Sequence, residues 1–206
     1  MKRVPIFATL LVCLAVAAMI ALGVWQLQRR GEKEALIARY AANRDLPPLA
    51  YPERAPVADD AMFRKSRVIC LRVFGWRVTG GATPTGQGGY RHIAECMTGA
   101  EGPGALIDMG VAANPAFKPD WRGGAVDGLI TTEPNQASLI GKAVGNAPPL
   151  RPMLVADVPA PGLAASAPPS ADGVSNNHLA YAVQWFLFAG IATVIYVIAL
   201  MRRGKA

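Results

Sequence analysis

Two long runs of apolar residues, one near each end, dominate the pattern of hydrophobic and polar positions along this chain. The first covers residues 4–27 and the second residues 177–201, and neither contains Asp, Glu, Lys or Arg. As helices with a rise of ~1.5 Å per residue, both are long enough to cross the ~30 Å hydrocarbon core of a membrane. The pattern therefore predicts a membrane protein with two transmembrane α-helices that flank a central domain.

The pattern over residues 28–157 predicts a short helical extension followed by a β-rich domain, an α+β arrangement. Residues 28–42 keep the apolar spacing of a helix, so the first helix continues until Pro47 and Pro48 end it. Short β-branched segments separated by Gly-rich breaks then predict strands in a sandwich-like or barrel-like fold whose strand order stays open. The predicted strands are residues 67–73, 91–97, 105–111, 125–132 and 153–156.

The segments around the second run indicate how the chain crosses the membrane. Residues 158–176 are rich in Pro, Ala and Ser and predict an extended tether leading back to the membrane. No Lys or Arg occurs in the twenty residues before this run, whereas residues 202–206 form a basic tail. The positive-inside rule places the tail in the cytoplasm, and two spans place the N-terminus there too. Basic residues after the first run oppose this orientation: Arg29, Arg30, Lys33, Arg39 and Arg44.

The first run also has features of a cleaved signal peptide, because Lys2 and Arg3 resemble a charged leader. However, the run is longer than the roughly 7–15 apolar residues of a signal peptide. The small-residue triplet at 15–17 lies in the middle of the run, where cleavage would leave an apolar N-terminus. We therefore expect an uncleaved anchor.

The net charge of +7 does not indicate nucleic-acid binding. Lys2, Arg3 and the basic tail account for much of this charge and follow from membrane topology. The other basic residues alternate with acidic ones, as in residues 29–34, which is typical of a solvated or headgroup-facing helix. The Gly-rich segments lack the Walker A spacing and the strand–GxGxxG–helix context, so nucleotide binding is not supported.

Cysteine and histidine give little support for catalytic or metal chemistry in the central domain. Cys70 and Cys96 fall in neighbouring predicted strands, and in an oxidising compartment they either form a disulfide or remain separate thiols. His92 lies in the same strand as Cys96 but roughly 13 Å away, too far for a Cys–His catalytic pair. The motifs CxxC, CxxxC, HExxH and CxxCH do not occur. We expect a structural role for His92 and no enzymatic activity.

His178 opens the second apolar run, and a helix that begins near Asn177 places His178, Tyr181, Ala182 and Trp185 on one face. On this face Ala182 leaves a recess below the imidazole, bordered by the two aromatic rings. A flat macrocycle with a central metal fits such a surface, because neutral imidazole is a common axial ligand of haem iron. The alternative is an interfacial group that contacts only water and lipid headgroups.

The two apolar runs also contain glutamines at similar predicted depth. Gln26 follows Trp25 near the end of the first run, and Gln184 lies about two turns into the second. The two amides either form a hydrogen bond across a helix–helix contact or face a partner protein or a bound cofactor.

The two ends together resemble a known family. Residues 23–30 (GVWQLQRR), followed by Lys33 and Leu36-Ile37, resemble the opening signature of the Surfeit locus (Surf) family of cytochrome c oxidase assembly factors. Residues 177–186 (NHLAYAVQWF) resemble the second-helix signature of that family, and the layout of helix, external domain and helix also matches. Residues 108–111 (DMGV) replace the more usual Asn-Arg-Gly-Trp type of sequence, so a role of that turn in relatives does not transfer.

The resemblance implies a non-enzymatic assembly factor in the bacterial inner membrane, with both termini cytoplasmic and the central domain periplasmic. It implies that His178 binds the iron of haem a and that the protein assists insertion of this haem into the catalytic subunit of the oxidase. The implied partners are that subunit, the haem a synthesis machinery and the lipid bilayer. The alternative is a membrane scaffold that stabilises an oxidase assembly intermediate and binds no cofactor.

Overall fold

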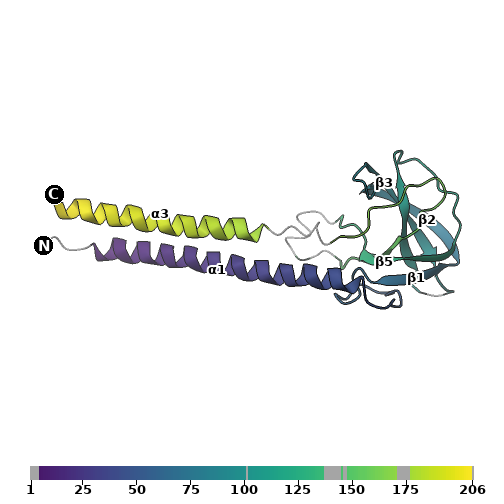
Figure 1. Ribbon diagram of the computed structural model, residues 1–206, viewed down its shortest axis with the longest axis horizontal. Helices are drawn as coiled ribbons and strands as arrows, with labels where there is room; N and C mark the ends of the chain where they lie inside the picture. Colours follow the sequence, from purple (N-terminus) through teal and green to yellow (C-terminus); the bar gives the residue numbers. More distant parts are fainter. Residues whose placement is uncertain (1–4, 101, 137–144, 146–147, 171–176, 206) are drawn as a thin grey trace. The chain divides into compact units, whose positions relative to one another are not determined.

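The computed structural model describes residues 5–100, 102–136, 145, 148–170 and 177–205 (Figure 1). The chain divides into two compact units. The first comprises Met1–Ile37 and Asp172–Ala206 and contains the two apolar runs, and the second is Ala38–Ala171. This division agrees with the predicted combination of a membrane-embedded part and a central β-rich domain.

Two long helices form the first unit. Helix α1 extends over Ile6–Asn43 and α3 over His178–Lys205. Both are long and apolar enough to span a membrane, and only 6% of each apolar window is buried within the protein, which leaves most side chains available to lipid. The predicted extension at residues 28–42 is part of α1, which continues through Gly31 and contributes its last turns to the second unit.

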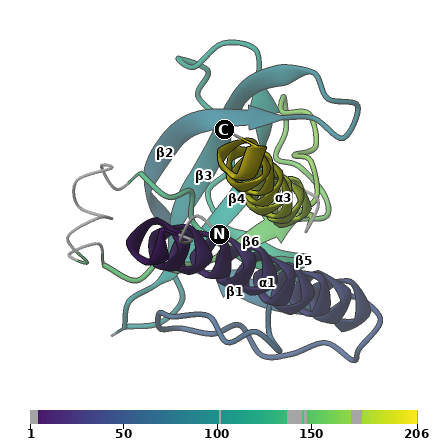
Figure 2. The ribbon, with the colours of Figure 1, turned by 90° about the vertical axis from the view of Figure 1, so that its left-hand side faces the viewer.

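The two helices run in opposite directions and pack through one line of side chains on each, here called the helix seam (Figures 1 and 2). On each helix the less exposed positions are separated alternately by three and four residues. The average spacing of 3.5 residues is typical of closely packed helix pairs. The seam positions are Thr9, Val12, Val16, Met19, Gly23 and Gln26 on α1, and His178, Ala182, Trp185, Ala189, Ala192 and Tyr196 on α3.

The seam is fixed by a polar contact at each end. Gln26 contacts His178, and Thr9 Oγ1 lies 2.5 Å from the Tyr196 hydroxyl. Because the Thr9 hydroxyl donates its hydrogen to the Pro5 carbonyl at 3.0 Å, Tyr196 is the donor to Thr9. Satisfied polar pairs of this kind stabilise helix contacts in lipid, where water does not compete for the hydrogen bonds.

The second unit is built on one mixed sheet of six strands in the order β1-β5-β6-β4-β3-β2. All neighbouring strands are antiparallel except β4 and β6, which are parallel. The strands are β1 (Lys65–Cys70), β2 (Arg72–Ala82), β3 (Gly88–Met97), β4 (Ala105–Ala112), β5 (Gly124–Thr132) and β6 (Pro152–Ala156).

The sheet is strongly curled, because β1 and β2 lie at its opposite edges although only Leu71 separates them. At this corner the Leu71 N–H donates to Met97 O at 2.8 Å, and the Val73 N–H donates to Arg122 O at 3.1 Å. These two hydrogen bonds connect the corner to β3 and to the segment before β5, so the curled sheet resembles a partly closed barrel.

Most predicted strands are present, but the first one is divided in two. The predicted strand at 67–73 bends at Leu71, so its residues belong to both β1 and β2. Most of β2 was not predicted, because the Gly80-Gly81 pair within it suggested a break. In the structure a Cβ at Gly75 would lie 2.6 Å from a carboxylate oxygen of Glu95 on β3. Glycine at this position therefore makes room for a neighbouring side chain instead of ending the strand.

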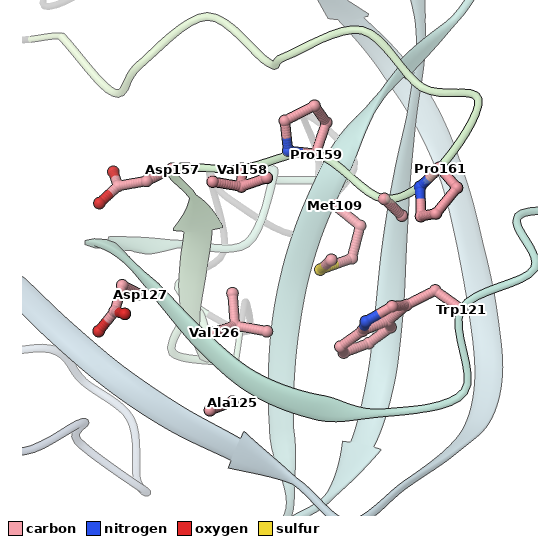
Figure 3. A pocket seen from close by; sticks show the side chains of 10 residues that line it. Met109, Trp121, Ala125, Val126, Asp127, Asp157, Val158, Pro159 and Pro161 are labelled. Atoms are coloured by element: carbon pink, nitrogen blue, oxygen red, sulfur yellow. The ribbon is translucent and has the colours of Figure 1, made fainter.

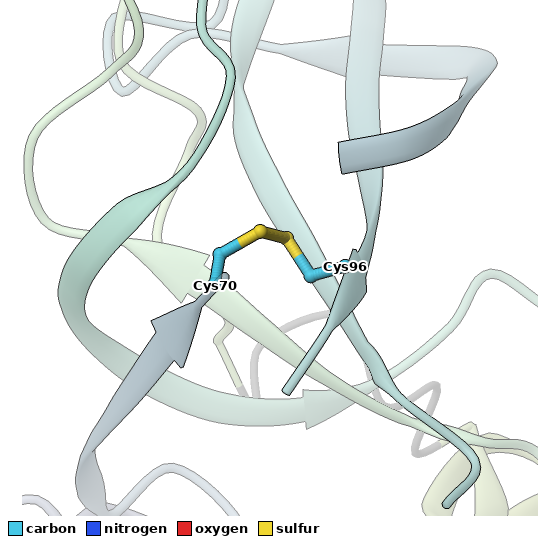
Figure 4. Close-up of a disulfide and its surroundings, with 2 residues drawn as sticks. All are labelled: Cys70 and Cys96. Carbon is cyan, nitrogen blue, oxygen red and sulfur yellow. A yellow bond between two sulfur atoms is a disulfide. The ribbon is translucent and has the colours of Figure 1, made fainter. Parts of the chain in front are cut away.

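A disulfide crosses the core of the curled sheet. Cys70 at the end of β1 and Cys96 on β3 are both buried, with their Cα atoms 5.3 Å apart and their sulfur atoms bonded (Figure 4). The sequence was compatible with either a disulfide or two separate thiols, and in the structure the two cysteines form the disulfide. The apolar side chains of the surrounding core cluster include Val68, Ala94, Ile107, Ile130 and Leu154.

Residues 157–170, most of which belong to the extended tether predicted at 158–176, form a strap that packs along β4. Val111 and Ala164 exchange backbone hydrogen bonds of 2.8 and 2.9 Å, and Ala160 and Leu163 are buried. The Pro- and Ala-rich composition thus gives an extended segment, but its small side chains allow close packing on the sheet. Residues 171–176 of the predicted tether lie outside the described residues.

Candidate functional site

The functional candidate His178 lies at the N-terminal end of α3 and meets Gln26 of α1. The imidazole Nδ1 is 2.7 Å from Gln26 Oε1, and the pair is partly buried. Within the described ranges of the chain, no protein group forms a hydrogen bond with the other ring nitrogen, Nε2. His178 therefore has one nitrogen engaged at the helix contact and one nitrogen without a partner among the residues that the structure describes.

Small residues next to this pair bring the helices close together. A Cβ at Gly23 would lie only 2.6 Å from Phe186 Cε1, and Ala182 is 1% exposed. The absence of large side chains at these seam positions lets the backbones approach, as small residues do in membrane helix pairs. This close approach allows the amide of Gln26 to reach the imidazole of His178.

The predicted cofactor face is brought together only in part. His178, Ala182 and Trp185 all lie on the seam, whereas Tyr181 is 52% exposed beside it. The recess expected below the imidazole is not open, because burial of Ala182 closes that position. Trp185 is half-buried, and its ring lies 6.2 Å from that of Phe188 in an edge-on arrangement. An aromatic surface next to His178 is thus provided chiefly by Tyr181.

The predicted helix-contact residues have different surroundings. Gln26 lies on the seam, but Gln184 is exposed, and no hydrogen bond joins the two amides among the residues that the structure describes. Position 184 falls between seam positions 182 and 185, which explains why it does not face α1. Trp25 is also exposed, next to the seam. Trp25 and Gln184 are therefore available to lipid or to another protein.

The sequence contains a signal for the His178–Gln26 pair, which appears only when the two helices are compared with each other. Gly23 and Gln26 are three residues apart, and the spacing from His178 to Ala182 to Trp185 is four and then three. Aligning these two short heptad segments in antiparallel register brings the glutamine to the histidine.

A second polar cluster, not identified from the sequence, joins the strap to β4. Asp108 is fully buried, and its Oδ1 accepts hydrogen bonds from Ser166 Oγ at 2.7 Å and from the Gly110 N–H at 3.1 Å. Arg91 Nε lies 3.1 Å from the other carboxylate oxygen. Burial raises the pKa of the Asp108 carboxyl, and the charge of Arg91 and the two hydrogen bonds oppose this rise. The cluster holds the strap in place and does not form an open site.

His92 is a core residue, as expected. It is fully buried, its ring lies 5.9 Å from that of Phe117 in an edge-on contact, and burial lowers the pKa of its imidazole. Cys96 on the same strand is in the disulfide and has no free thiol. Across the described part of the chain, no three His, Cys, Asp or Glu side chains are grouped as a metal site would require.

An open pocket of about 390 Å³ lies between β5 and the strap (Figure 3). Its walls include Met109, Trp121 and Pro159, with Asp127 and Asp157 on the same side as each other. Asp127 is held by two hydrogen bonds of 2.7 Å from Arg67. The described residues that line this pocket include no Ser, Thr, Cys or Lys nucleophile and no histidine base.

Comparison with known proteins identifies one family. The model of the SURF1 family matches residues 13–190, a range that includes Gln26, the whole central domain and His178. A search of curated proteins finds no match.

Proposed function

Because the chain belongs to the SURF1 family, whose members act in cytochrome c oxidase assembly, we propose that it carries haem a to the catalytic subunit of the oxidase. His178 is the proposed ligand of the haem iron. The observation that supports this role is an imidazole at the end of a membrane hairpin, with Nδ1 held by Gln26 and Nε2 without a protein partner among the described residues.

The chemistry of the surroundings agrees with a haem cargo. A neutral imidazole nitrogen is a strong ligand for haem iron, and the exposed ring of Tyr181 lies one helical turn from His178. Trp185 adds an aromatic side chain two turns from the histidine. A largely apolar macrocycle is therefore compatible with this end of the hairpin, where apolar helix surface adjoins polar residues.

A single protein ligand suits a carrier better than a permanent haem protein. His178 alone would hold the haem less tightly than two strong protein ligands would, and this weaker hold would favour release to a receiving site. Transfer then requires that the oxidase subunit provide stronger ligation than His178 does. We propose that this subunit and the enzymes that supply haem a are the partners.

We also propose that both termini are cytoplasmic and that the central domain is periplasmic. The basic residues Arg202 and Arg203 directly after α3 support this orientation through the positive-inside rule. The buried disulfide between Cys70 and Cys96 supports it as well, because disulfides persist in oxidising compartments such as the periplasm.

The test is the haem content of the purified full-length protein, produced in a cell that makes haem a. Replacement His178→Ala should remove most of the co-purifying haem a, measured by its absorption spectrum, while the amount of protein in the membrane stays the same. Leu179→Ala, at the exposed neighbouring position, is the matched control and should keep the haem. Equal haem content in wild type and His178→Ala would favour the cofactor-free scaffold instead.

A further inference from the structure

We propose that Gln26 is a positioning residue that holds His178 in the tautomer with hydrogen on Nδ1, and so makes Nε2 the nitrogen that binds iron. This inference rests on the proposed haem-binding function of His178. It assigns to Gln26 a specific part in cargo binding, in addition to its contact with the second helix.

The direction of the hydrogen bond follows from the chemistry of the two groups. The Gln26 carbonyl oxygen Oε1 carries no hydrogen and only accepts, so at 2.7 Å from Nδ1 it requires a hydrogen on that nitrogen. A neutral imidazole has a single N–H, and therefore Nε2 carries the lone pair. Without Gln26, both tautomers of His178 are available to the apo-protein, and only one presents Nε2 to a metal.

The fold holds this pair in register although 152 residues separate them in the sequence. Both residues lie on the helix seam, and the contact between Gly23 and Phe186 sets the separation of the helices one turn away. In a membrane-embedded hairpin water competes weakly for the Nδ1 hydrogen, which strengthens the preference for one tautomer.

The consequence for ligation is a more basic and better oriented imidazole. A metal-binding histidine commonly donates its second N–H to an acceptor, which fixes the ring and raises the basicity of the metal-binding nitrogen. Loss of such an acceptor typically lowers metal affinity about 10–100-fold. We therefore expect Gln26→Leu to weaken haem a binding by a factor in this range.

The first test needs no haem. The chain contains two histidines, His92 and His178, so the nitrogen spectrum of ¹⁵N-histidine-labelled full-length protein is assigned with His178→Ala. We expect wild-type His178 to carry its hydrogen on Nδ1 and Gln26→Leu to shift the population towards Nε2–H. An Nε2–H tautomer in the wild type overturns the proposal, and this result does not depend on how well the variant folds. An unchanged His178 spectrum in Gln26→Leu overturns it as well.

The second test is titration of the same proteins with haem a in detergent. Gln26→Leu should bind about 10–100-fold more weakly. Gln26→Glu should retain binding, because its carboxylate accepts the same hydrogen. Gln184→Leu, which removes an exposed glutamine from α3, is the matched control and should bind as the wild type does.

The titration separates this inference from the function on which it rests. If His178→Ala binds haem a as well as the wild type does, the proposed carrier function fails. If His178→Ala loses binding but Gln26→Leu retains wild-type affinity, the carrier function stands and the positioning role of Gln26 is wrong.

Discussion

The ring of Phe186 on α3 packs directly over Gly23 on α1, so closely that a Cβ at residue 23 would come within 2.6 Å of Cε1. Gly23 is buried, although most of α1 is exposed to the membrane. Three residues further along α1, Gln26 reaches His178. The glycine therefore controls the distance across which the functional pair forms.

Gly23→Val should destabilise the helix pair by about 1–3 kcal/mol, the usual cost of inserting atoms into a packed contact. Loss of helix on titration with sodium dodecyl sulfate in mixed micelles, followed by circular dichroism, measures this change. Gly190→Val is the matched control, because a Cβ at Gly190 meets no atom within 4 Å. Combining Gly23→Val with Phe186→Ala should restore part of the stability that Gly23→Val loses, because the clashing ring is removed. Equal losses for Gly23→Val and Gly190→Val would contradict a specific contact at Gly23.

Removing the disulfide with Cys70→Ala and Cys96→Ala should lower the free energy of unfolding of the central domain by about 3–4 kcal/mol. The reason is the entropy that the unfolded chain regains when a loop with a sequence separation of 26 is opened. Urea unfolding of the detergent-solubilised full-length protein measures the loss. Dithiothreitol should destabilise the wild type only, and Cys13→Ala should have no effect, since Cys13 is an exposed free cysteine in α1.

The parts of the fold that could be predicted from the sequence are those with a local periodic signal. Both membrane helices follow from apolar runs, and strands β3 to β6 follow from β-branched segments between glycines. Strand β2 could not be predicted in this way, because the fit of Gly75 into the strand depends on the side chain of Glu95 on the adjacent strand, which occupies the space that a Cβ would need. Such a requirement depends on the strand register, which the local pattern does not contain.

The candidate site shows the same limit. His178 and Gln26 were both identified as polar residues within apolar runs, but their pairing depends on how two helices far apart in sequence align. Composition likewise predicted an extended segment after β6, but not its packing on β4. That contact includes a hydrogen bond from Ser166 to the buried carboxylate of Asp108, 58 residues earlier in the sequence, which the local composition does not reveal.

Ser166→Ala should weaken the attachment of the strap to β4 and lower the stability of the central domain by about 1–3 kcal/mol. The substitution removes one of two hydrogen bonds to Asp108 Oδ1 and leaves a buried carboxylate less satisfied. The change is measured by urea unfolding and by the rate of proteolysis within the strap. Thr98→Ala, at an exposed position outside the strap, should change neither quantity.

The stability of the central domain should fall as the pH is lowered from 7 towards 5, because of His92. Burial lowers the pKa of His92 below the value of about 6.5 that it has in the unfolded chain. The unfolded state therefore takes up a proton first, and stability that is complete above about pH 7 is lost as the pH falls through the unfolded-state pKa. The limiting slope for one proton is about 1.4 kcal/mol per pH unit.

His92→Leu should abolish this loss, measured as the difference in urea unfolding free energy between wild type and variant from pH 5 to 8. Asp108, whose pKa is raised, contributes in the opposite sense: its stabilisation is greatest at low pH and decreases as the pH rises through its folded-state value. Because Asp108 is present in both proteins, its contribution cancels in the difference.

His178→Ala removes the other histidine and should keep the wild-type slope, since His178 lies in the helix pair and not in the domain core. A slope that persists in His92→Leu would show that another group takes up the proton on unfolding.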